Sequence, residues 1–140
     1  MSQKSKFIFY TPLIMAVMPI LGIFSLYLTA FLPIPGLGHL ALIYQPVFGP
    51  ANIILEAFRY IIPGFQISGD LPPIRFMLMF LIWSIIGVIY GIILYVIQKR
   101  FNEQPTFGVK IFFVVVLSQF VFAYPLTYLI AQILRPVFSR

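Results

Sequence analysis

The sequence predicts an all-α integral membrane protein that forms a single multi-pass domain over residues 1–140. Of the 140 residues, 61% are hydrophobic and only 9% are charged, and the mean hydropathy is +1.05. Soluble domains carry about 25% charged residues. The apolar residues form long runs, whereas the strands of an outer-membrane barrel alternate apolar and polar residues in blocks of about ten. Because a bilayer core about 30 Å thick takes about 20 apolar residues per helix, three spans fit comfortably.

The first span is expected at about residues 7–32. Lys4 and Lys6 precede it, but the apolar run is too long for the core of a cleaved signal peptide, which has about 7 to 15 residues. Pro12 and Pro19 lie inside the run. Proline is tolerated in a membrane helix if neighbouring groups satisfy the freed carbonyls, so we expect a retained helix with a bend near Pro19.

The second and third spans are expected at about residues 74–98 and 110–134. Pro73 suits the first turn of the second span, since the missing N–H of proline is harmless there. Pro125 lies within the third span and predicts a kink in that helix.

Between the first and second spans, the sequence predicts a pair of short helices. The stretches "LPIPGLG", "YQPVFGP" and "IIPGF" contain helix breakers within an otherwise apolar segment. They delimit helices at about 37–45 and 50–62, which reach only about 13 and 20 Å. We interpret the pair as interfacial or re-entrant.

The alternative is a chain with four spans, in which residues 37–62 form one broken span. The positive-inside rule favours it slightly: with a cytoplasmic N-terminus, four spans place six Lys or Arg residues inside and three outside, against five and four for three spans. However, Pro46, Gly49 and Pro50 would leave backbone groups unpaired at mid-depth. We therefore prefer three spans, with the N-terminus in the cytoplasm.

One of the three acids of the chain lies in the second short helix. Asn52, Glu56 and Arg59 fall within about 60° of one another on a helical wheel. This spacing predicts an intramembrane ion pair between Glu56 and Arg59, because residues three apart share a helix face.

Small or polar residues gather on one face of each long span. Residues Gly87 to Gly91 form a G-x-x-x-G, and small residues let membrane helices approach closely. These faces are either internal contacts among the three helices or surfaces for a partner or a pore. The candidate residues are Gly22, Ser25, Ser84, Gly87, Gly91, Tyr124, Tyr128 and Gln132.

The residues that carry most catalytic chemistry are scarce. There is no cysteine, one histidine (His39) and only three acids (Glu56, Asp70 and Glu103), and a zinc site takes three or four such ligands. We therefore expect no metal, no cofactor and no enzymatic activity. The net charge of +6 comes from dispersed residues near the span ends, so we expect no nucleic-acid binding.

Two functions remain from the sequence. The preferred hypothesis is a small membrane protein that acts by contact, as an accessory, assembly or scaffold subunit. Its expected partners are the lipid bilayer and either other membrane subunits or a second copy of the chain. The alternative is an oligomeric channel or transporter, because broken helices are typical of transport sites.

Overall fold

The computed structural model describes residues 2–32, 34–62, 73–101 and 104–139. Their secondary structure is helical: α1 (Gln3–Phe31), α2 (Leu37–Tyr44), the 3₁₀ turn η1 (Gln45–Phe48), α3 (Gly49–Ile61), α4 (Pro73–Phe101) and α5 (Val109–Phe138). Three helices are long and apolar enough to cross a membrane, at Gln3–Gly22, Pro73–Phe101 and Val109–Phe138. The predicted fold class, with three spans and two short helices, is confirmed.

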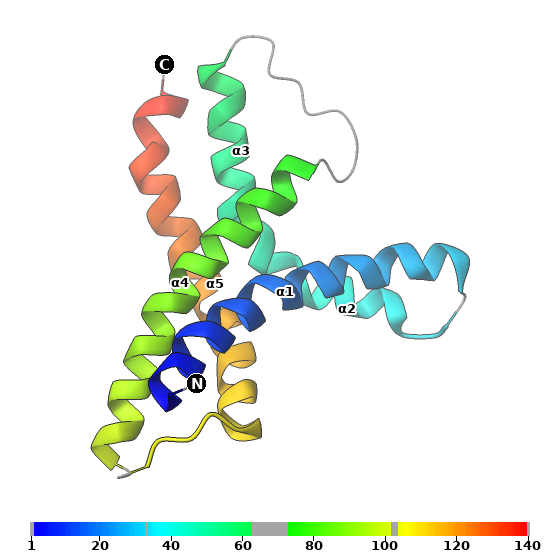
Figure 1. The fold of residues 1–140 in the computed structure, drawn as a ribbon. Helices are drawn as coiled ribbons and strands as arrows, with labels where there is room; N and C mark the ends of the chain where they lie inside the picture. The colour runs from blue at the N-terminus through cyan, green and yellow to red at the C-terminus, as the bar shows by residue number, and fades with distance from the viewer. Residues whose placement is uncertain (1, 33, 63–72, 102–103, 140) are drawn as a thin grey trace.

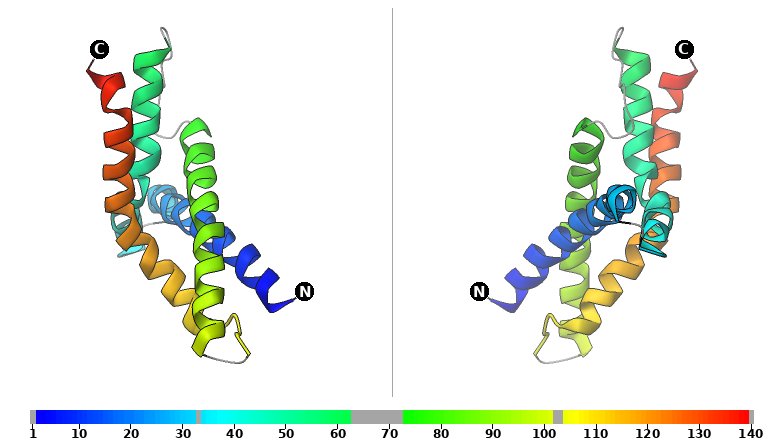
Figure 2. Two further views of the ribbon diagram at one scale, coloured as in Figure 1. Left: turned by 90° about the vertical axis from the view of Figure 1, so that its left-hand side faces the viewer. Right: turned by 90° about the vertical axis from the view of Figure 1, so that its right-hand side faces the viewer.

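Each long helix extends beyond its predicted bounds. α1 begins four residues earlier than expected because the Ser2 side chain accepts a hydrogen bond from the Ser5 backbone N–H at 3.1 Å, which caps the first turn. Pro12 and Pro19 both lie inside α1, and Pro125 lies inside α5. Figure 2 shows α5 bending near its middle, in the region of the expected kink.

The second half of α1 and α2 form a helical hairpin that stands to one side of the other helices (Figure 1). We call this segment the arm and define it as residues 20–32 and 34–44. α2 folds back along α1, and α3 then leaves in a different direction (Figure 1). Residues 37–62 therefore do not form one broken span, and the four-span alternative is not the fold of the structure.

The remaining helices form a body in which α1 crosses α4 and α3 packs along α5. Their common core contains the fully or almost fully buried side chains of Met15, Val47, Ala51, Met79, Trp83, Val115 and Ala123. These residues come from α1, η1, α3, α4 and α5, so the centre of the body is where all of these elements meet.

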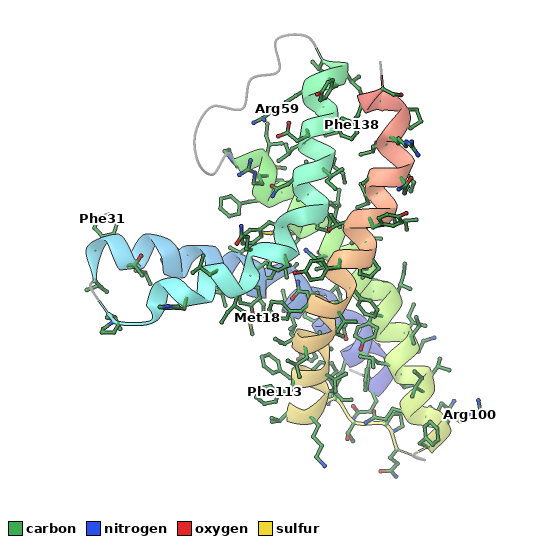
Figure 3. The ribbon with its side chains drawn as sticks, turned by 180° about the vertical axis from the view of Figure 1, so that it is seen from behind. Met18, Phe31, Arg59, Arg100, Phe113 and Phe138 are labelled. Atoms are coloured by element: carbon green, nitrogen blue, oxygen red, sulfur yellow. The ribbon has the colours of Figure 1, made fainter. Side chains whose placement is uncertain are left out.

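The body has two ends with different chain segments. At one end, the start of α1 meets the segment before α5, where the Phe7 and Phe107 rings pack with centroids 5.2 Å apart. At the other end, α3 and α5 finish together, and the Tyr60 and Phe138 rings lie 5.3 Å apart. Figure 3 shows Arg100 near the first end and Arg59 near the second. We call these the N-terminal end and the C-terminal end of the body.

Candidate functional site

Among the described residues there is no group of three or more His, Cys, Asp or Glu side chains that could hold a metal ion. His39 is exposed on α2. Two of the three acids, Asp70 and Glu103, lie outside the described residues. The candidate site is therefore built from the contacts among helices and from the surfaces that those contacts leave open.

The glycines of the G-x-x-x-G lie against the first half of α1. A Cβ atom on Gly91 would lie 2.5 Å from the Phe7 carbonyl oxygen, and a Cβ atom on Gly87 would meet the Cα atom of Pro12. The two backbones are thus in direct contact, which is what small residues permit in a membrane helix pair. Ser84 is half-buried, one turn before Gly87. This face of α4 is an internal contact.

A glutamine from α5 donates a hydrogen bond to α1 at the position where Pro19 interrupts the helical hydrogen bonding. Pro19 has no N–H, so it cannot bond the Met15 carbonyl four residues earlier, as a helical residue ordinarily would. The Gln119 side chain takes that place: its Nε2 donates to the Met15 carbonyl at 2.5 Å. Gln119 is fully buried. A polar side chain from a neighbouring helix therefore satisfies the carbonyl that the proline leaves free.

A tryptophan performs a similar task at the start of α3. The Trp83 Nε1–H donates to the Val47 carbonyl at 3.0 Å, and the ring is fully buried. Val47 lies in η1, and Pro50, three residues later, has no N–H for an i to i+3 bond to this carbonyl. The bond joins α4 to the break between η1 and α3.

Two further close approaches join the short helices to the long ones. A Cβ atom on Gly22 of α1 would lie 2.5 Å from a ring carbon of Tyr44, and one on Gly49 would lie 2.5 Å from the Thr127 Oγ1 of α5. Gly22 is therefore an internal contact between α1 and α2. The predicted candidate Ser25 belongs to α1, but its side chain lies outside the described ones.

The three candidate contact residues of α5 lie on its exposed face, not against another helix of the chain. Tyr124 is 70% exposed and Tyr128 is 67% exposed, and Gln132 is exposed as well. The buried face of α5 carries Gln119 and Ala123 instead. Internal contacts among the three helices therefore do not account for these three residues of α5.

The predicted ion pair between Glu56 and Arg59 is present in the structure. Arg59 Nη1 donates to Glu56 Oε1 at 2.6 Å, and the side chains of Arg59 and Glu56 are 38% and 46% exposed, respectively. Figure 3 shows Arg59 projecting from α3 near the C-terminal end of the body. The Oδ1 atom of Asn52, on the same face, is buried and has no hydrogen-bond partner among the described residues. The pair is local and open to its surroundings in the isolated chain.

Two fully buried side chains have polar atoms without hydrogen-bond partners in the described structure, the Thr11 Oγ1 and the Gln119 Oε1. Buried polar atoms are ordinarily paired. Thr11 belongs to the small or polar face of the first span, whereas the sequence pattern did not single out Trp83 or Gln119. A signal for Gln119 was its amide in the middle of an apolar span, facing a helix with an internal proline.

An apolar groove lies between Ile20, at the start of the arm, and the first half of α4. It is open, holds about 590 Å³, and is lined by apolar side chains of α4 and by Ile20 of α1. A smaller groove of about 230 Å³ lies between α4 and α5 around Ile86 and Pro125. Neither groove is lined by an acid, a base or a histidine.

No protein-family model matches the chain, and no curated protein or solved structure matches it significantly.

Proposed function

We propose that this small multi-pass membrane protein acts by contact, as an accessory, assembly or scaffold subunit of a larger membrane assembly, and catalyses no reaction. The observation that supports this most directly is the arm. It extends away from the body (Figure 1), and Figure 3 shows Phe31 at its tip. The arm exposes large apolar side chains: Leu21, Phe24, Phe31, Leu42 and Ile43.

The composition of the arm supports its placement within the membrane. Between Lys6 and Glu56 the sequence has no lysine, arginine, aspartate or glutamate. The hairpin can therefore stay in the hydrocarbon without the cost of about 2.5 to 3.5 kcal/mol that a central charge incurs. Lipid alone offers little reason for two helices to project from a bundle, because membrane helices gain stability by packing against other helices. A neighbouring membrane subunit would supply that packing.

The distribution of basic residues supports a cytoplasmic location for the N-terminal end of the body. Five basic residues lie at this end of the body, and the described part of the C-terminal end has three. Cytoplasmic segments carry an excess of lysine and arginine. The two sets are Lys4, Lys6, Lys99, Arg100 and Lys110 at the N-terminal end, and Arg59, Arg75 and Arg135 at the C-terminal end.

Site-specific photocross-linking in native membranes tests the proposed function. A photoreactive phenylalanine analogue replaces Phe31 or Leu42 on the arm, which are 81% and 64% exposed, and Ile89 on α4 serves as the matched control at 57%. We expect the arm positions to give a discrete protein adduct and Ile89 to give mainly lipid adducts. Equal, diffuse labelling from all three positions would contradict the proposal.

A specific observation also favours the alternative, an oligomeric channel or transporter. The unpaired Thr11 Oγ1 and Gln119 Oε1 lie in the body of the protein, with Gln119 bonded at a proline break. Transport sites are often built at breaks of this kind near the bilayer midplane. Reconstitution into liposomes with ion and solute flux assays tests this function, and fluxes equal to those of empty liposomes would remove it.

A further inference from the structure

The outer face of α5 is a continuous stripe directly opposite the buried face of this helix. At about 100° per residue, its members fall within about 80° on a helical wheel. We call this set the α5 stripe; its members are Leu117, Val121, Tyr124, Tyr128 and Gln132, and all five are exposed.

Three of these residues carry polar groups in the membrane-spanning part of the chain. Tyr124 lies at the centre of the 30-residue helix α5, with Tyr128 one turn and Gln132 two turns further on. The hydrocarbon core offers no water to hydrogen-bond with a hydroxyl or an amide, so membrane helices use such groups to bind other helices. A partner helix would therefore supply hydrogen bonds to these exposed polar groups.

From this arrangement we propose that the α5 stripe binds the α5 stripe of a second copy of this chain, about a twofold axis parallel to the bilayer normal. The tyrosine hydroxyl and the glutamine amide each contain both a donor and an acceptor, so each can pair with its own counterpart. All copies enter the membrane in one orientation, and a rotation about the normal places identical residues at the same depth.

The spacing along the stripe fits a helix pair. Leu117, Val121, Tyr124 and Tyr128 follow one another at intervals of four, three and four residues. This alternation is the heptad pattern by which two helices pack with a left-handed crossing, the commonest geometry in membrane bundles.

The bend in α5 separates the positive charges of the two α5 helices in the proposed dimer. Figure 2 shows that α5 is convex on the side away from α3 and α4. Two convex helices approach most closely at their bends, near Val121 to Tyr128, and diverge toward their ends. Arg135 lies on the same side of the helix, two turns beyond Tyr128. The divergence keeps the two copies of this positive charge apart.

Disulfide cross-linking tests the proposed dimer directly, because the chain has no native cysteine. A single cysteine is introduced by Val121→Cys, or by Ile133→Cys as the control. The two side chains are similarly exposed, at 69% and 66%, but Ile133 points away from the stripe. Membranes that contain the full chain are oxidised mildly. We expect a covalent dimer from Val121→Cys at least tenfold faster than from Ile133→Cys.

A second measurement follows the pairing without a new cysteine at the interface. Fluorescently labelled protein is reconstituted in liposomes at decreasing protein-to-lipid ratios, and energy transfer reports the dimer. The triple variant Tyr124→Phe, Tyr128→Phe, Gln132→Leu should bind itself about tenfold more weakly, since each membrane hydrogen bond contributes modestly. Tyr90→Phe, a conservative change on α4, should leave the transfer unchanged.

Three results would each overturn the proposal. They are a monomeric protein at every protein-to-lipid ratio, equal cross-linking from Val121→Cys and Ile133→Cys, and cross-linking of Val121→Cys only to a different protein. The proposed dimer is independent of the partner of the arm. Photocross-linking from Phe31 and Leu42 would still succeed if the α5 stripe bound no second copy, and the dimer could form if the arm bound nothing.

Discussion

The α1–α4 crossing and the α5 stripe both include residues that the sequence marked as candidate helix contacts, but these residues have opposite environments. At the crossing, Gly87 and Gly91 bring the α4 backbone against Phe7 and Pro12, and a Cβ atom on either glycine would collide. On the α5 stripe, Tyr124 is 70% exposed. The difference shows that a helix face with small or polar residues can be buried within the chain or left exposed, and that the sequence pattern alone does not say which.

The largest effect is expected at the crossing. Gly87→Ala would place a methyl group against the Pro12 Cα, which is backbone and cannot turn aside. We expect the free energy of unfolding in mild detergent to fall by about 1 to 3 kcal/mol, the usual cost of overpacking. Tyr124→Ala on the α5 stripe should change the stability of the monomer by less than about 0.5 kcal/mol.

Gly108→Ala is the matched glycine control, since no described atom beyond its two chain neighbours lies within 4 Å of a Cβ placed there. If Gly87→Ala and Gly108→Ala are equally stable, the two helices do not meet as closely as the structure indicates, and the contrast with the α5 stripe disappears.

The second largest loss of stability is expected from Gln119→Leu, at the position where Pro19 interrupts the hydrogen bonding of α1. Gln119→Leu removes the donor to the Met15 carbonyl and leaves that group unpaired in the core. We expect a loss of about 1 to 2 kcal/mol, as for other buried groups without a partner. In the Pro19→Ala background the new backbone N–H of residue 19 can bond the Met15 carbonyl. Gln119→Leu should then lower the free energy of unfolding by less than about 0.5 kcal/mol.

Chemical unfolding of the four proteins of this double-mutant cycle measures the coupling. Additive effects of Pro19→Ala and Gln119→Leu would show that the glutamine does not serve the carbonyl freed by the proline.

The smallest effect is expected at the ion pair. Glu56 and Arg59 are both more than a third exposed, and exposed pairs contribute about 0 to 1 kcal/mol. A cycle of Glu56→Gln and Arg59→Ala should therefore give a coupling below about 1 kcal/mol for the isolated protein. A coupling of about 3 kcal/mol or more would indicate a buried pair, covered by a partner retained during purification.

The sequence predicted the helices well because hydrophobicity and length decide them. The runs around 7–32, 74–98 and 110–134 became α1, α4 and α5, and the breakers around Pro46 and Gly49 separated the two short helices. The G-x-x-x-G also marked a contact correctly, since small residues let the backbones of two membrane helices approach closely.

The pairing of these elements could not be predicted from periodicity. A helical wheel finds the face of α5 that carries Tyr124 and Tyr128, but Gln119 on the opposite face forms the internal bond. The decisive fact is that the Met15 carbonyl has no backbone N–H from residue 19 to bond, because that residue is proline. This connects a proline in α1 with an amide in α5 that lies 104 positions from Met15. Such a pairing depends on tertiary structure.

The measurement that tests the fold most directly is the sidedness of single introduced cysteines. Ser2 and Gln104 belong to the N-terminal end of the body, and Arg59 and Ser139 belong to the C-terminal end. With a membrane-impermeant thiol reagent, we expect cysteines at 2 and 104 to react from one side of the membrane and cysteines at 59 and 139 from the other. Labelling of 2 and 139 from the same side, with 104 opposite, would mean that the chain crosses four times, and would contradict both the α1–α4 crossing and the exposed face of α5 that rests on it.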